Sequence, residues 1–293
     1  MRKVKVAATQ MNCNWRIDEN LSQAQKLVVS ATNEGAKIIL LQELFETPYF
    51  CHQEKYHYFD LAAQLNGNPV IAKFSALARQ LKVVLPISFF ERCGNIFFNS
   101  LVVIDADGKV LDVYRKTHIP TGQDYEEKFY FAPGDTGFKV WTTKYGRIGV
   151  GICWDQWFPE TTRILTLKGA EIVFFPTAIG SEPVLGYNSE PHWQRTIQGQ
   201  SAANLVPIVV SNRVGTEVDE NKLTFYGSSF ITNQFGEILS QADQKSTSFI
   251  TAELDLDQVM QDRRNWGVFR DRRPEMYQDL LSLAAINENT SNS

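Results

Sequence analysis

The stretch Gly-Val-Gly-Ile-Cys-Trp-Asp-Gln-Trp-Phe-Pro-Glu, residues 149–160, is the most informative part of the chain. The apolar run from Arg147 to Ile152 predicts a buried strand, and a helical pattern follows over Pro159 to Lys168. Cys153 therefore lies at a strand end, where backbone N–H groups and the positive end of a helix dipole stabilise a thiolate and an oxyanion. Taken alone, this position fits a buried structural cysteine equally well.

Two charged residues also follow apolar strands. The run Lys37 to Leu41 ends just before Glu43, and the alternating run Val110 to Lys116 is broken by Thr117-His118-Ile119-Pro120. A Glu, a Lys and a Cys, each at the end of a separate strand, are the parts of an acyl-transfer site. The Cys would attack, the Glu would take its proton, and the Lys would hold charge on the carbonyl oxygen. The alternative for each residue by itself is a surface or salt-bridged side chain.

These three blocks together resemble the nitrilase superfamily of carbon–nitrogen hydrolases, whose signature is a Glu–Lys–Cys triad. Gln42-Glu43 is similar to the Glu block, residues 114–118 (Tyr-Arg-Lys-Thr-His) to the Lys block, and residues 151–155 (Gly-Ile-Cys-Trp-Asp) to the Cys block. The resemblance covers nearly the whole chain, from Val4 to Tyr277. It implies that the Glu is the catalytic base, the Lys its electrostatic partner and the Cys the nucleophile.

The resemblance also implies a second active-site glutamate after the Lys. By the match of residues 125–131 (Tyr-Glu-Glu-Lys-Phe-Tyr-Phe) this is Glu127, with Glu126 as the other register. It further implies that the backbone N–H of Trp154 helps to hold the oxyanion, and that His118 of the Lys block lies among the substrate-binding residues.

The residues after the Cys block bear on the substrate. Relatives that hydrolyse carbamoyl amino acids carry an Arg there for the substrate carboxylate, whereas this chain has Gln156 and Trp157. Glu182, in the loop 177–183, is expected to meet a cationic group, the alternative being a solvated loop carboxylate. Aromatic side chains are expected to line an apolar channel for a methylene chain: Tyr49, Phe50, Tyr56 and Trp193.

Within the superfamily, the segments Glu127 to Val140, His192 to Gly199 and Asn204 to Gly215 most resemble members that hydrolyse N-carbamoylputrescine. This implies hydrolysis to putrescine, ammonia and carbon dioxide through a thiocarbamoyl intermediate on the Cys, in polyamine biosynthesis and without a cofactor. The alternative substrates are a β-ureido acid, an N-carbamoyl amino acid, a simple amide and the amide of an α-keto acid (the omega-amidase reaction). A scaffold that keeps the fold without turnover is less favoured, because the triad is intact.

No Pro/Ser/Gly-rich linker divides the 293 residues, so we expect one domain, 1–293, with a flexible polar tail at 286–293. The apolar periodicity predicts helices at 18–34, 69–80, 159–168 and 191–204. It predicts strands at 3–9, 37–41, 82–89, 97–104, 109–113, 138–142, 147–152, 171–175 and 207–211, and a hairpin at 228–239. This alternation indicates a mixed α/β fold. The resemblance sharpens it to a four-layer α-β-β-α sandwich of the nitrilase type.

The charge balance and the cysteine pattern restrict the classes of partner and ligand that the protein is expected to bind. A net charge of −4 argues against nucleic acid and against an acidic membrane. No apolar stretch approaches the roughly 18 residues of a membrane span, and no signal peptide is evident, so we expect a cytoplasmic protein. Neither the four cysteines nor the four histidines show metal-ligand spacing, so we expect free thiols and no metal.

The C-terminal region predicts self-association. The Arg-rich segment 263–277 mixes basic and acidic residues and precedes four apolar residues, Leu280, Leu281, Leu283 and Ala284. Family members form dimers and larger assemblies, so the resemblance implies a homo-oligomer in which this stretch packs on a second copy. The alternative is a helix docked on its own core.

Overall fold

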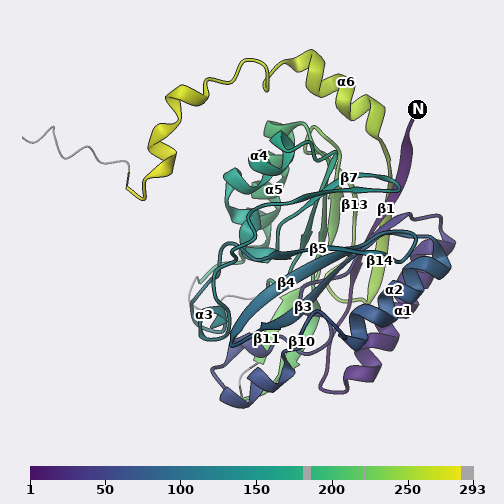
Figure 1. Cartoon of the computed structure of the whole chain (residues 1–293), viewed down its shortest axis with the longest axis vertical. Coiled ribbons are helices and arrows are strands. Elements are labelled where there is room, and N and C mark those ends of the chain that lie inside the picture. The colour runs from purple at the N-terminus through teal and green to yellow at the C-terminus, as the bar shows by residue number, and fades with distance from the viewer. Residues whose placement is uncertain (181–185, 221, 285–293) are drawn as a thin grey trace, which may run out of the picture.

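Two β-sheets lie face to face between two layers of helices (Figure 1). The computed structural model describes residues 1–180, 186–220 and 222–284. The strands are β1 (Lys3–Gln10), β2 (Ile38–Leu40), β3 (Leu85–Cys93), β4 (Ile96–Ile104), β5 (Val110–Arg115), β6 (Val140–Thr143), β7 (Gly146–Val150), β8 (Ile172–Pro176), β9 (Ile208–Ser211), β10 (Val214–Val218), β11 (Lys222–Tyr226), β12 (Phe230–Thr232), β13 (Ile238–Gln241) and β14 (Ser248–Asp255). The α-helices are α1 (Ile17–Asn33), α2 (Pro69–Leu81), α3 (Glu127–Tyr130), α4 (Pro159–Leu167), α5 (Glu190–Asn204) and α6 (Leu256–Trp266). Short 3₁₀ turns are η1 (Phe50–His52), η2 (Tyr56–Leu61), η3 (Cys153–Trp157), η4 (Pro274–Met276) and η5 (Gln278–Leu281).

The first sheet is built from two three-stranded pieces, in the orders β14-β1-β2 and β3-β4-β5. Backbone hydrogen bonds join them, because Ile39 N–H donates to the Val84 carbonyl and Val84 N–H donates to the Lys37 carbonyl. The strand β1 pairs antiparallel with β14 and parallel with β2. Glu43 follows β2, and Lys116 directly follows β5.

The second sheet has the strand order β13-β12-β9-β8-β7-β6. Its central strands β7, β8 and β9 run parallel, so their carboxyl ends meet at one edge of the sheet. Cys153 follows β7, Ala178 follows β8 and Arg213 follows β9, all at this edge. Ligand sites of parallel sheets commonly lie outside this edge.

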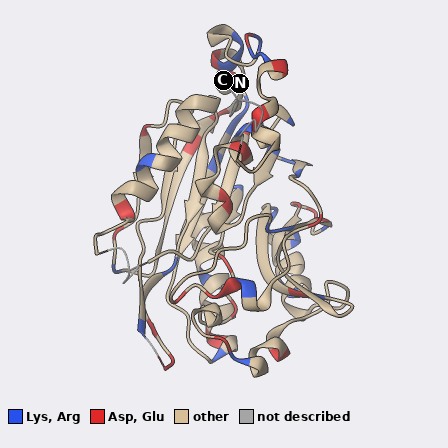
Figure 2. Ribbon diagram, turned by 90° about the vertical axis from the view of Figure 1, so that its left-hand side faces the viewer, with Lys and Arg blue, Asp and Glu red and all other residues tan. Residues whose placement is uncertain are grey.

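Three apolar layers hold the sandwich together. In Figure 2, which is turned by 90° from Figure 1, most of the ribbon of the central strands is tan, which marks residues other than Lys, Arg, Asp and Glu. One layer packs α1 and α2 on the first sheet and includes Leu27, Phe74 and Ile87. A second fills the space between the sheets, and a third packs α4 and α5 on the second sheet. These layers confirm the predicted four-layer α-β-β-α sandwich. No helix in the ranges that the structure describes is long and apolar enough to span a membrane.

The predicted elements differ from the structure at a few boundaries. The strand predicted at 82–89 is displaced, because Lys82 closes α2 in a left-handed conformation (φ 57°) and β3 runs from Leu85 to Cys93. The hairpin β10–β11 was not predicted, although its five-residue strands pair in regular antiparallel register. The tail 286–293 lies outside the described residues, and a single domain over 1–293 stays a prediction.

Candidate active site

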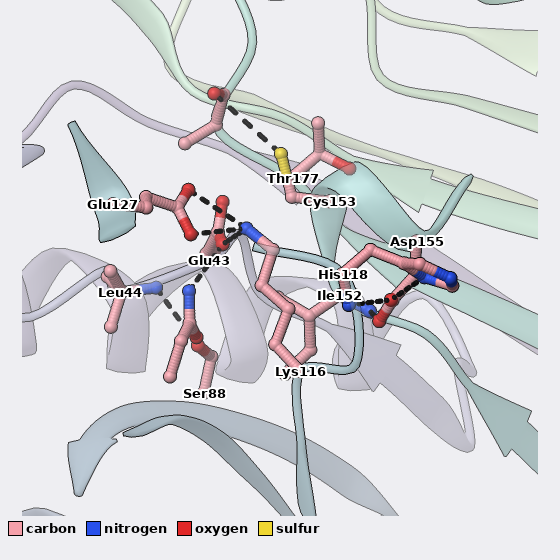
Figure 3. Close-up of polar contacts among 12 residues, drawn as sticks. Glu43, Leu44, Ser88, Lys116, His118, Glu127, Ile152, Cys153, Asp155 and Thr177 are labelled. Carbon is pink, nitrogen blue, oxygen red and sulfur yellow. Dashed lines mark hydrogen bonds and ion pairs between the residues drawn. The ribbon is translucent and has the colours of Figure 1, made fainter. Parts of the chain in front are cut away.

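Three charged side chains converge in the interior: Glu43 and Lys116 from the ends of strands, and Glu127 from the start of α3 (Figure 3). The Lys116 ammonium donates to Glu43 Oε1 at 2.9 Å and to both Glu127 oxygens at 2.7 and 2.9 Å. All three side chains are fully buried, with 0% exposed. An ion cluster removed from water is tolerated only when its members neutralise and hydrogen-bond one another. The Lys116 ammonium is therefore held in a defined position between the two carboxylates.

Neutral neighbours complete the two carboxylates. Asn99 Nδ2 donates to Glu43 Oε1 at 2.7 Å, and the Tyr49 hydroxyl donates to Glu127 Oε1 at 2.6 Å. Glu43 Oε2 is buried and has no hydrogen-bond partner among the described residues. One oxygen of Glu43 is thus fixed, and the other is available to accept a proton.

Burial and charge set the protonation states of this cluster. Burial raises the pKa of the Glu127 carboxyl to about 7, against the lowering effect of the Lys116 ammonium. Burial would lower the pKa of Lys116, but the carboxylates of Glu127 and Glu43 hold it well above its usual value. Lys116 therefore stays an ammonium at neutral pH and supplies a fixed positive charge.

Cys153 lies at a sharp bend between β7 and η3. Its φ is 43°, in the left-handed region that non-glycine residues seldom adopt, and its Sγ–H donates to the Ala178 carbonyl at 3.9 Å. Such strain is often found at functional sites. Only 6% of the residue is exposed.

The position of Cys153 at a strand end does not by itself lower the pKa of its thiol. Burial raises the pKa of the Cys153 thiol well above its usual value, and the Glu43 carboxylate raises it further, whereas Lys116 lowers it. The η3 turn, rather than α4, follows the cysteine directly. The thiol is protonated at neutral pH, so it needs a base before it can attack.

A buried carboxylate links the cysteine bend to the lysine strand. Asp155 accepts hydrogen bonds from the Ile152 N–H at 2.8 Å and from the Tyr114 hydroxyl at 2.7 Å. It also accepts from the His118 N–H at 3.0 Å and lies 2.7 Å from His118 Nδ1. These partners immediately precede Cys153 or flank the lysine on both sides. Asp155 thus holds the two segments at a fixed separation.

A cavity of about 190 Å³ opens onto the thiol. Glu127, Cys153 and Trp154 contribute to its wall, together with Tyr125 and Trp157. The Trp157 indole nitrogen is buried without a hydrogen-bond partner among the described residues. Apolar atoms predominate in such a wall, which suits an aliphatic chain carrying one polar head group.

Only some of the predicted substrate-binding residues line the cavity. Trp154 lines the cavity, and Tyr49 contacts Glu127 instead of the cavity wall. His118 stacks on Phe158 with ring centroids 3.6 Å apart. Glu182 lies outside the described residues, so its expected role stays a prediction.

The predicted channel is not formed as expected. Trp193 is wholly buried, and its indole N–H donates to Gln156 Oε1 at 2.9 Å, so it belongs to the α5 core rather than to the cavity wall. Tyr56 is 81% exposed and packs on Phe129. Both aromatic residues were placed by composition, which does not reveal the direction of a side chain. Phe50 is buried in a separate aromatic cluster.

Sequence reasoning missed several site residues. Asn99 and Asp155 are buried polar residues with hydrogen bonds to the segments that carry Glu43 and Cys153. Asn99 interrupts an apolar strand, β4, and this interruption was the available signal. No cluster of three or more potential metal-ligating side chains occurs within residues 1–180, 186–220 and 222–284.

Comparisons with known proteins identify the class to which this site belongs. Residues 5–264 match the model of the carbon–nitrogen hydrolase family. The chain is 52% identical over 287 residues to an N-carbamoylputrescine amidase of Oryza sativa subsp. japonica, with 96% of this chain and 95% of that protein covered. The chain therefore belongs to the carbon–nitrogen hydrolase family and is an enzyme of the nitrilase superfamily.

Two further matches define its neighbourhood in that family. A citrullinase of Francisella tularensis subsp. tularensis is 50% identical over 283 residues, with 96% of this chain and 99% of that protein covered. The crystal structure of a carbon–nitrogen hydrolase from Helicobacter pylori G27 superposes with a TM-score of 0.90 at 37% identity. The superposition covers 96% of this chain and 99% of the Helicobacter pylori chain.

Proposed function

We propose that this enzyme hydrolyses N-carbamoylputrescine, with Cys153 as nucleophile, Glu43 as general base and Lys116 as the electrostatic partner. The observation that carries the proposal is the Glu43 carboxylate. One of its oxygens is held by Asn99 and Lys116, and the other is unpaired in the described structure. A buried protonated thiol beside an oriented carboxylate is the arrangement that nucleophilic catalysis by cysteine requires.

The proposed reaction begins with proton transfer from the Cys153 thiol to Glu43. The sulfur then bonds to the ureido carbon, and the negative charge moves to the carbonyl oxygen. Lys116 and the backbone N–H of Trp154 stabilise that oxyanion. The C–N bond breaks as the departing nitrogen takes the proton from Glu43, which leaves a carbamoyl thioester on the cysteine.

Water completes the cycle. Glu43 takes a proton from the water as its oxygen attacks the thioester carbon, and the Cys153 sulfur leaves with the proton. The released carbamic acid decomposes to carbon dioxide and the remaining amine or ammonia, so the products are putrescine, ammonia and carbon dioxide. Glu127 holds the Lys116 ammonium in place through both of its oxygens.

The cavity wall supports a substrate without a carboxylate. The wall residues within the described ranges include Glu127 but neither Lys nor Arg. The rice relative named N-carbamoylputrescine amidase supports the same substrate. Citrulline is the second candidate, because of the Francisella tularensis citrullinase. It carries the same ureido group on an alkyl chain that ends in an amino acid.

A substrate panel separates these candidates. Ammonia release should give a kcat/KM for N-carbamoylputrescine at least about tenfold above the values for citrulline and N-carbamoyl-β-alanine, since an unpaired buried carboxylate forfeits a charge-assisted hydrogen bond. An uncharged carbamoyl-alkylamine of equal length tests whether the far ammonium is recognised. A higher kcat/KM for citrulline would overturn the substrate and leave the catalytic residues in place.

We also propose that the enzyme acts as a homo-oligomer in the reducing cytoplasm. Its four cysteines are unpaired, as a reducing compartment requires. The C-terminal segment beyond α6 lies outside the sandwich on the side of α4 and α5 (Figure 1), and its Leu280 and Leu281 are 67% and 83% exposed. Exposed apolar side chains in one segment favour burial against another surface.

Light scattering tests the assembly. At micromolar concentration the mass should be a multiple of the 33.3 kDa chain mass. Replacing Leu280 and Leu281 with Asp should lower that mass, because a charge is costly in an apolar interface. The matched exposed leucine Leu239, which is 45% exposed on β13, should tolerate the same change. A wild-type mass equal to one chain would contradict self-association.

A further inference from the structure

Arg213 is a wholly buried cation that the proposed reaction does not use. It lies between β9 and β10 and is 0% exposed. Its Nη1 donates to Glu217 Oε1 at 2.7 Å, which gives an ion pair buried on both sides. A buried guanidinium is costly unless its donors are satisfied, so the direction of those donors indicates what the residue holds.

The other hydrogen bonds of the two Nη atoms converge on one loop, residues 43–47, while Nε is buried without a hydrogen-bond partner among the described residues. Nη2 donates to the Leu44 carbonyl at 2.6 Å and to the Glu43 carbonyl at 3.0 Å, and Nη1 donates to the Thr47 carbonyl at 3.0 Å. This is the loop that carries the proposed base. The planar fork of Arg presents several donors at fixed angles, which a flexible ammonium cannot reproduce.

Arg213, together with its ion-pair partner Glu217, forms what we call the clamp. It holds a loop whose backbone is strained. Leu44 has a φ of 49°, in the left-handed region that a leucine seldom adopts. Its N–H donates to Ser88 Oγ at 3.1 Å on β3, while its carbonyl accepts from Arg213. The residue next to the proposed base is therefore held from two sides in an unfavourable conformation (Figure 3 shows the Ser88 contact).

Glu217 extends the same clamp to the second carboxylate. Its Oε2 accepts from the Tyr49 N–H at 2.6 Å, and the Tyr49 hydroxyl donates to Glu127 at 2.6 Å. Arg213 thus contacts the backbone of Glu43 directly, and Glu217 is linked to the Glu127 side chain through Tyr49. These are the two carboxylates that contact the Lys116 ammonium.

We propose that Arg213 and Glu217 are positioning residues that hold Glu43 and Glu127 on Lys116, an inference that rests on the proposed roles of Glu43 and Lys116. Displacement of reacting groups by about 1 Å lowers rates by about 10²-fold. Loosening the clamp therefore lowers kcat more than it weakens substrate binding, because the pair is absent from the cavity wall.

Two variants and one control test the proposal. Arg213→Lys keeps the charge and loses the fork, and Arg213→Met with Glu217→Gln removes both charges without leaving one unpaired. The matched control is Arg263→Lys in α6, since that partly buried guanidinium also donates to backbone carbonyls, those of Ala170 and Leu205. Near-ultraviolet circular dichroism establishes that each variant is folded.

Both clamp variants should lower kcat for N-carbamoylputrescine at least about tenfold, with KM changed far less, and Arg263→Lys should leave both unchanged. The pH profile adds a readout that stability alone does not move. Wild-type activity should fall below about pH 7 as the Glu127 carboxyl takes up a proton. A loosened Lys116 lowers that pKa less, so the acid limb should shift to higher pH.

Alkylation of Cys153 by iodoacetamide needs no substrate and so separates this inference from the proposed substrate. The clamp variants should react at least about tenfold more slowly than wild type, approaching Glu43→Gln. If the wild type does not hydrolyse N-carbamoylputrescine while the alkylation rate still depends on the clamp, that result contradicts the proposed substrate and supports the positioning role. The positioning role would be overturned if folded clamp variants had the kcat, pH profile and alkylation rate of Arg263→Lys. It would also be overturned if both clamp variants unfolded.

Discussion

Cys153→Ser is expected to lower kcat for N-carbamoylputrescine at least about 10⁴-fold while the protein stays folded. Loss of the nucleophile has effects of this scale in hydrolases that act through a covalent intermediate. Burial already raises the pKa of the thiol well above its usual value, and a hydroxyl in the same place is far harder to deprotonate. Ammonia release measures the rate, and near-ultraviolet circular dichroism measures folding.

The control for this variant is Cys93→Ser. Cys93 is exposed at the end of β3, so its replacement should leave kcat unchanged. The buried thiols Cys13 and Cys51 should also tolerate serine with most of the activity kept. An alkylating substrate analogue that labelled one of these three and spared Cys153 would remove the cysteine from its proposed role.

The second large effect is expected from Glu43→Gln, which should lower kcat at least about 10²-fold. The amide oxygen of glutamine can still accept from Asn99 and Lys116, but the second atom of the group is no longer a base. Lys116→Arg should cause a comparable loss, because the planar fork cannot reproduce the contacts of a compact ammonium with two carboxylates.

The matched control is Glu171→Gln. Glu171 is also a buried carboxylate in an ion pair, with Arg2 at 2.7 Å, at the start of β8 and away from the cavity wall. It should lower the free energy of unfolding and leave kcat per folded molecule unchanged. A near-normal kcat in Glu43→Gln would sink its role as base.

Glu43, Lys116 and Cys153 follow strands as the sequence predicts, because apolar runs that end at a polar residue are visible in one sequence, and their catalytic roles stay a proposal. The choice between Glu126 and Glu127 as the glutamate beside Lys116 depends on the three-dimensional structure. Glu127 is fully buried on Lys116, whereas Glu126 is partly exposed and accepts from the Thr121 hydroxyl. Sequence spacing does not distinguish two adjacent glutamates at the start of a short helix.

Other features depend on contacts between distant segments. Arg213 touches the Glu43 loop across about 170 positions of sequence, and no local pattern announces such a contact. The protonated state of Cys153 follows from its burial beside two carboxylates, which outweighs the local effect of a turn. Trp193 was misplaced because an aromatic residue on a helix serves a core and a cavity equally well.

The central claim is that the reaction passes through a covalent intermediate on Cys153. Acid quenching of the wild type during turnover of N-carbamoylputrescine, followed by peptide mass spectrometry, tests it directly. We predict a carbamoyl or alkylcarbamoyl thioester on the Cys153 peptide, and the adduct mass identifies the nitrogen that leaves first. Turnover without an adduct on that peptide, or an adduct on Cys13, Cys51 or Cys93, would contradict the claim.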